Sequence, residues 1–111
     1  MIEQGQFTLH ATFLAQPDKY DEMKAISRQS FDLTRDTPGL MHLLCLEPTK
    51  IGEPFVIVSV WRAKADFQAF LQTPRMREFH SNQAIQTMFE TAMAEATANF
   101  CTVMDEWHID Q

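Results

Sequence analysis

The spacing of hydrophobic residues changes several times along the chain, and each change predicts a new element. Between residues 6 and 14, apolar and polar positions alternate with a period of two, which is typical of a half-buried strand. From residue 17 to 36, apolar residues recur at steps of three and four, which predicts an amphipathic helix that begins near Pro17 and Asp18. The Thr-Pro-Gly sequence at 37–39 should end this helix, because proline disfavours a helical conformation at the residue before it.

Two short apolar segments follow, at residues 40–47 and 55–61. Residues 55–61 are rich in the β-branched and aromatic residues that strands prefer, and the turn residues between Pro48 and Gly52 predict an antiparallel hairpin. The unbroken apolarity of residues 40–47 suggests a strand that is buried on much of both faces. Helical spacing then runs from residue 64 to 93, with a restart at Thr73-Pro74, and residues 99–109 are expected to form the last strand.

The predicted order of elements is β-α-β-β-α-β, without a linker or a repeat, so the expected fold is a single α+β domain of the ferredoxin-like type over residues 1–111. That topology implies a sheet in the order 4-1-3-2, with Cys45 and Cys101 on opposite edges as reduced thiols. Helices would cover only one face of the sheet. The other face should be buried by a second copy of the chain, in a homodimer.

The net charge of −6 and the pI near 5.0 argue against a nucleic-acid partner, which would need clustered Lys and Arg. No apolar stretch is long enough for a membrane span, and no secretory signal is evident, so a cytoplasmic location is expected. The charge is uneven, because residues 50–77 carry a local balance of +3 that could attract an anionic group. Its basic residues are Lys50, Arg62, Lys64, Arg75 and Arg77.

Aromatic residues and methionines are more abundant than the core of so small a domain needs. The chain holds 9 Phe, 7 Met and 2 Trp, and some of them are expected to line a pocket or an interface. Ser59 lies in a central strand, but no base partner or GxSxG turn accompanies it, so a nucleophilic role is not assigned.

Three consecutive segments carry a resemblance to a known family. They are the strand EPFVIVSVW, the helix start KADFQAFL and the sequence TPRMREFH, which lie between residues 53 and 80, and the resemblance is sharpest over residues 53–82. They resemble the antibiotic biosynthesis monooxygenase superfamily of dimeric α+β barrels, in which a strand ends on Trp, a Phe-containing helix follows, and a His comes about nineteen residues after the Trp. Here the corresponding residues are Trp61, Phe67 with Phe70, and His80.

Within that superfamily, the segment looks most like the haem-degrading monooxygenases. That likeness implies His80 as axial iron ligand, Trp61 as the ring that distorts the porphyrin, and basic residues such as Arg77 for the propionates. The chain departs from those enzymes because its first strand has no Asn, and His10 is the nearest polar substitute. Haem is therefore the alternative cofactor, and His80 the metal ligand only if haem binds.

Other members of the superfamily oxidise flat phenols or quinols without metal or flavin. The resemblance to them implies a pocket between the sheet and the second helical region, with His80 or His10 as base and the Trp61 indole N–H as donor. A small monooxygenase of this kind, with no cofactor, is the preferred hypothesis, and a non-catalytic binding or stress-response protein is the third. The expected substrate-binding or wall residues are Phe7, Leu9, Phe13, Ile57, Trp61, Phe67, Phe70, Arg77, Phe79 and Met88.

Overall fold

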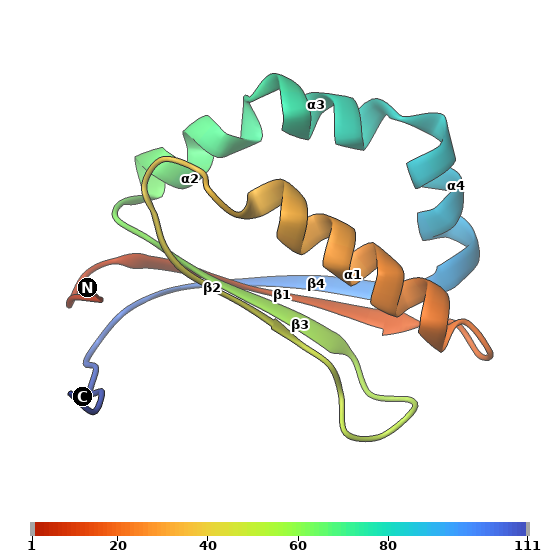
Figure 1. The fold of residues 1–111 in the computed structure, drawn as a ribbon, viewed down its shortest axis with the longest axis horizontal. Coiled ribbons are helices and arrows are strands. Elements are labelled where there is room, and N and C mark those ends of the chain that lie inside the picture. Colours follow the sequence, from red (N-terminus) through yellow and green to blue (C-terminus); the bar gives the residue numbers. More distant parts are fainter. Residues whose placement is uncertain (1, 111) are drawn as a thin grey trace.

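A computed structural model describes residues 2–110 as an antiparallel sheet with helices on one of its faces (Figure 1). The strand order is β2-β3-β1-β4, which confirms the predicted ferredoxin-like α+β topology. In chain order, the elements are β1 (Phe7–Ala15), α1 (Tyr20–Thr34), β2 (Leu40–Leu46), β3 (Phe55–Trp61), α2 (Lys64–Leu71), α3 (Pro74–Ser81), α4 (Gln83–Ala92) and β4 (Met93–Thr102).

The register of the central strands decides which side chains face the helices. Leu9 of β1 is paired with Ser59 of β3, and Ala11 is paired with Ile57. Because side chains alternate along a strand, the odd-numbered residues of β1 and β3 point toward the helix layer and the even-numbered ones point away from it. The face turned away from the helices is called the outer face below.

The helix layer consists of α1 and an arc formed by α2, α3 and α4 (Figure 1). On α1, Met23 and Ile26 are buried and pack with Phe55 and Ala92. The arc is broken where side chains cap new helices. Thr73 accepts a hydrogen bond from the backbone N–H of Met76 at 3.3 Å, as its position before Pro74 predicts.

The last strand is not where the sequence pattern placed it. β4 spans Met93–Thr102, whereas residues 103–110 are not in a strand. The expected strand over residues 99–109 therefore overlaps β4 only at residues 99–102, and Trp107 beyond it is 84% exposed. β4 is an edge strand with small and polar residues, so its sequence carries little hydrophobic signal.

Two further predictions about the ends and edges of elements were wrong. The first helix begins at Tyr20, because Asp18 adopts a left-handed φ of 65° that a helix excludes. β2 is not buried on both faces: it is the other edge strand, and Leu44 and Leu46 on its outer face are each 43% exposed. Cys45 and Cys101 are free thiols on the opposite edges, as predicted. No helix within residues 2–110 has the length and apolarity to cross a membrane.

A glycine at the start of β2 fixes how closely the sheet approaches α2. Gly39 has a φ of +86°, and its carbonyl accepts a hydrogen bond from the Arg62 N–H at 2.8 Å. A Cβ at this position would overlap the side chain of Asp66 on α2. Gly52, in the β2–β3 connection, has a φ of +100° with open space around it, which makes it a matched control.

We predict that Gly39→Ala lowers the free energy of unfolding by about 3 kcal/mol, since backbone strain and overpacking add, whereas Gly52→Ala loses about 1 kcal/mol through strain alone. Urea denaturation of the two variants and the wild type measures this difference. Equal losses would show that the approach of Asp66 to Gly39 does not constrain the fold.

Candidate functional site

A cavity of about 450 Å³ lies between the sheet and the helix layer. Its floor includes Ala11 of β1 and Ala98 of β4, which are paired in register and leave space above the middle of the sheet. The full set of lining residues is drawn from strands β1, β3 and β4 and from all four helices: Leu9, Ala11, Phe13, Ser30, Thr34, Ile57, Ser59, Phe67, Phe70, Leu71, Met76, Phe79, His80, Phe89, Met93, Ala98 and Phe100.

The lining is apolar with few polar groups. None of the lining residues is Lys, Arg, Asp or Glu, and the polar side chains are those of Ser30, Thr34, Ser59 and His80. The Thr34 hydroxyl already donates a hydrogen bond to the Ser30 carbonyl at 2.7 Å. A flat, largely apolar molecule with one or two oxygen atoms matches such a lining.

His80 marks the opening of the cavity. It lines the cavity and is nevertheless exposed, as are Leu71 and Phe100, which are 38% and 54% exposed. The opening therefore lies between the arc of helices and β4. The imidazole packs edge-on against the ring of Phe79, with 5.8 Å between ring centroids. This position gives it access both to a bound molecule and to solvent.

Trp61 lies behind the cavity and is not on its lining. Its side chain is fully buried and packs against Phe67 and Phe70, with ring centroids 5.5 and 5.4 Å away. Its indole Nε1–H donates to the Ser59 Oγ at 2.9 Å. The expectation that this N–H would donate directly to a substrate stays a prediction that this contact with Ser59 disfavours. The sequence signal that could have revealed the pair is the spacing of two residues along one strand.

The other residues expected on the pocket wall are partly brought together. Leu9, Ile57, Phe67 and Phe70 line the cavity. Phe7 does not line it, but stacks with Phe67 and Phe100 at 5.6 Å from each ring and so supports the wall. Phe13 and Phe79 also line the cavity, whereas Met88 packs in the core beside α1.

Two residues predicted to act in the pocket lie elsewhere. His10 pairs with Val58 and Asn99 and points to the outer face, since its neighbours Leu9 and Ala11 face the cavity. Arg77 is exposed on α3 and donates to the Gln72 side-chain oxygen at 2.6 Å.

The basic residues of the middle of the chain do not form an anion site in the cavity either. Arg62 is paired with Asp66 at 2.9 Å, and Arg75 donates to the backbone carbonyl of Asp32 at 3.2 Å. Consequently no cation stands ready inside the cavity to neutralise an anionic ligand.

The contacts that the haem-degrading enzymes imply do not fit this site. A ring that distorts a porphyrin must touch it, but Trp61 is fully buried behind Phe67 and Phe70. Arg77, expected near a propionate, is not among the lining residues.

The sequence of this chain matches one known protein family. The family model described as antibiotic biosynthesis monooxygenase matches residues 6–82. The chain belongs to this family. The match covers β1 to α3 and so includes Trp61, Ser59 and His80. Sequence comparison with curated proteins gave no significant match.

Solved structures share the fold over nearly the whole chain. PA3566 of Pseudomonas aeruginosa is 16% identical, with a TM-score of 0.74 over 91% of this chain and 96% of its own. SO0527 of Shewanella oneidensis is 14% identical, with a TM-score of 0.72 over 93% and 95%. SnoaB of Streptomyces nogalater, a cofactor-independent oxygenase, is 14% identical, with a TM-score of 0.70 over 92% and 96%. At these identities the likeness shows the fold alone.

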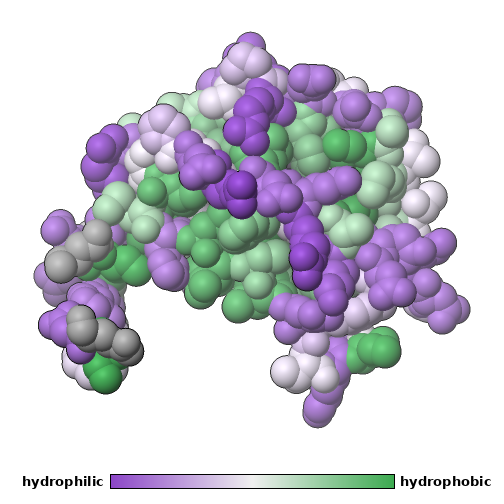
Figure 2. All heavy atoms as spheres, in the orientation of Figure 1, coloured by the Kyte–Doolittle hydropathy of each residue, from purple (hydrophilic) through white to green (hydrophobic). Residues whose placement is uncertain are grey.

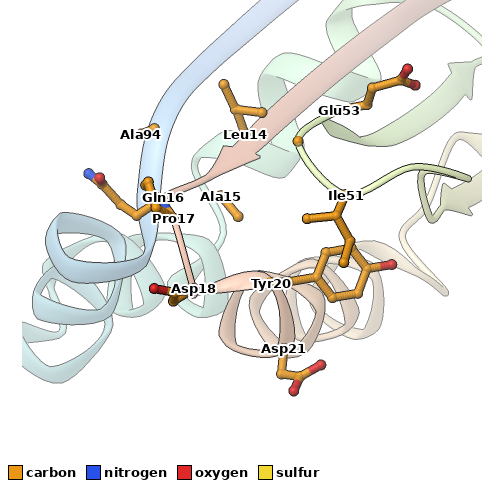
Figure 3. A pocket seen from close by; sticks show the side chains of 11 residues that line it. Leu14, Ala15, Gln16, Pro17, Asp18, Tyr20, Asp21, Ile51, Glu53 and Ala94 are labelled. Atoms are coloured by element: carbon orange, nitrogen blue, oxygen red, sulfur yellow. The ribbon is translucent and has the colours of Figure 1, made fainter.

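A second cleft, of about 560 Å³, lies at the C-terminal end of β1 (Figure 3). Tyr20 and Ile51 line it, together with the carboxylates of Asp18, Asp21 and Glu53. It is larger than the cavity but contains no histidine, and its carboxylates would repel a phenolate. We therefore take the apolar cavity as the candidate active site.

Tyr20 provides a direct check of the geometry around this cleft. Its hydroxyl donates a hydrogen bond to Glu47, which also pairs with Lys24 at 3.2 Å. The hydrogen bond to Glu47 raises the pKa of Tyr20 to about 12, because ionised tyrosine could not donate it. The neutral phenol is thus favoured in the folded state, and its contribution to stability is lost as pH rises from about 10 through 12.

Since Tyr20 is the one tyrosine of the chain, its ionisation can be followed by ultraviolet absorbance alone. We predict a midpoint near pH 12, and a fall toward pH 10 in Glu47→Gln. Glu53→Gln, which removes a carboxylate of the same cleft without touching this hydrogen bond, should leave the midpoint unchanged. A wild-type midpoint near pH 10 would contradict the Tyr20–Glu47 contact.

Proposed function

We propose that the protein is a cofactor-free monooxygenase that oxidises a flat phenol or quinol in the cavity. The observation that carries this proposal is an apolar, uncharged cavity with a solvent-reaching imidazole, His80, at its opening. Support also comes from the family match and from the shared fold with SnoaB, which is described as a cofactor-independent oxygenase.

The cavity favours an uncharged aromatic ring as the molecule that enters. Ile57 and the paired Ala11 and Ala98 line the cavity on the sheet side. Phe67 and Phe70 line it on the helix side. Burial of the ring surface would drive binding, while transfer of a charged molecule into such a lining would be costly. The substrate is therefore expected to enter as the neutral phenol and to ionise after it binds.

Oxidation then needs a base and molecular oxygen. In the proposed reaction, His80 accepts the phenolic proton, and the electron-rich phenolate reacts with O₂ at a ring carbon. One oxygen atom becomes a carbonyl of the product and the other leaves as water, with both hydrogens coming from the substrate. The balance is phenol plus O₂ to quinone plus water, so no external reductant is required. Because His80 is exposed, it can pass the proton to solvent.

The test uses dithranol (1,8-dihydroxyanthrone), a flat polyphenol, with ¹⁸O₂. We predict that the protein accelerates oxygen uptake and that one labelled atom appears in 1,8-dihydroxyanthraquinone. His80→Ala should lower the rate above the buffer background roughly a hundredfold, as expected for loss of a general base. His108→Ala, a change of an exposed histidine outside the cavity, should retain the wild-type rate.

Three outcomes would decide between the proposals. Full activity in His80→Ala would remove the base from the mechanism. Ligand binding without oxygen uptake would instead favour a non-catalytic binding protein. A Soret band on titration with haemin that is lost in His80→Ala, with haem consumed on reduction in air, would favour the haem-degrading reaction.

We further propose that the protein is a homodimer that packs through the outer face of the sheet. Leu44 and Leu46 are each 43% exposed there, and Val56 and Val58 of β3 are only half-buried. Figure 2 shows apolar side chains gathered below the helices, in a hollow between the C-terminal segment and the β2–β3 connection. A second copy presents the same apolar surface, and the dimeric barrels that the chain resembles bury this face in that way.

Light scattering tests the dimer directly. We predict a mass twice the 12.8 kDa of one chain, and a shift to the monomer mass in Leu44→Glu, which places a charge on the outer face. Ala25→Glu, on an exposed position of α1, is the matched control and should remain a dimer. A wild-type monomer would refute the proposed interface.

A further inference from the structure

We infer that Ser59 is a catalytic residue, whose hydroxyl donates a hydrogen bond to the substrate oxygen that becomes negative, and that Trp61 is the positioning residue behind it. This inference rests on the proposed function and adds the group that recognises the oxygen atom of the substrate. The ligand chemistry it implies is a phenolic hydroxyl or carbonyl oxygen held at the floor of the cavity.

The first observation is a buried hydroxyl whose hydrogen has no acceptor. Ser59 is 3% exposed and lines the cavity. An indole N–H can only donate, so in the contact with Trp61 Nε1 at 2.9 Å the Ser59 Oγ is the acceptor. Among residues 2–110, the Ser59 hydroxyl donates no hydrogen bond, so its hydrogen is left without a partner.

The second observation is that Trp61 cannot easily change this arrangement. The ring is fully buried between Phe67 and Phe70, and its N–H has one partner, Ser59. The indole therefore holds one lone pair of the Oγ and restricts the directions in which the hydroxyl hydrogen can point. The accepted hydrogen bond also polarises the O–H and makes it a better donor.

The third observation is the lack of any cation in the cavity lining. Only His80, at the opening, becomes positively charged when it accepts the phenolic proton, so at the floor of the cavity hydrogen-bond donors must stabilise the phenolate. Thr34 already donates to a backbone carbonyl, and Ser30 is only half-buried on the α1 wall. Ser59 is the buried hydroxyl of the lining that is both fixed by a neighbour and free to donate.

Alizarin, a flat dihydroxyanthraquinone, provides a probe whose visible absorption distinguishes phenol from phenolate. We predict that the apparent pKa of the bound probe is lower in the wild type than in a variant without the Ser59 hydroxyl, because Ser59 donates to the phenolate. Ser59→Ala should weaken binding of the anion about tenfold and raise the bound pKa by about one unit. Ser59→Thr, which keeps a hydroxyl, should restore most of the shift, and Trp61→Phe should give an intermediate value.

Ser27→Ala is the matched control for loss of a buried hydroxyl. Ser27 is 1% exposed, but its hydroxyl donates to the Met23 carbonyl at 2.9 Å and does not line the cavity. This variant should bind alizarin as the wild type does. If Ser59→Ala fails to fold, Ser59→Cys keeps the volume with a weak donor and should show the same loss.

The outcomes distinguish the role of Ser59 from the proposed oxygenase function. An unchanged affinity and an unchanged bound pKa in Ser59→Ala or Ser59→Cys would overturn the role of Ser59 and leave the proposed function standing. Failure of the wild type to bind alizarin would overturn the role of Ser59 alone, whereas failure to oxidise dithranol would overturn the proposed function.

Discussion

The structure depends most on how the end of β3 is anchored to α2. Trp61 is fully buried there, in contact with Phe67 and Phe70, and its one polar atom is satisfied by Ser59. Aromatic contacts of this kind stabilise by burial of large rings, and the hydrogen bond avoids the cost of an unpaired indole N–H. The contact fixes the first helix of the arc above the sheet, and the rest of the arc follows from it.

Because the large rings gather at that end, the middle of the sheet can remain open. Ala11 and Ala98 face each other across β1 and β4, where larger residues would fill the space below α3 and α4. Large side chains at the end of β3 therefore stabilise the fold, and small ones in the middle of the sheet leave the cavity. Two polar groups of the lining have defined positions: the Ser59 hydroxyl is hydrogen-bonded to Trp61, and His80 lies at the opening.

Much of the fold could be predicted from the sequence, because β1 and α1 carry periodic patterns and β3 is rich in β-branched and aromatic residues. β4 could not, since an edge strand of small and polar residues resembles the end of a helix. In the site, His80 and the wall residues Ile57, Phe67 and Phe70 could be found from the family pattern, and they line one cavity. The hydrogen bond between Trp61 and Ser59 was missed, because periodicity predicts which face of the sheet a side chain lies on and not which group it contacts.

The central claim is that a flat hydroxyaromatic molecule binds above Ile57 with an oxygen at Ser59. A crystal structure of the protein with alizarin tests this most directly. We expect the ring system within the cavity, with one oxygen within hydrogen-bonding distance of Ser59 Oγ. The Trp61 indole N–H should still donate a hydrogen bond to that Oγ, and His80 should lie at the opening. A ligand bound in the cleft beside Tyr20, or with its oxygen atoms away from Ser59, would contradict it.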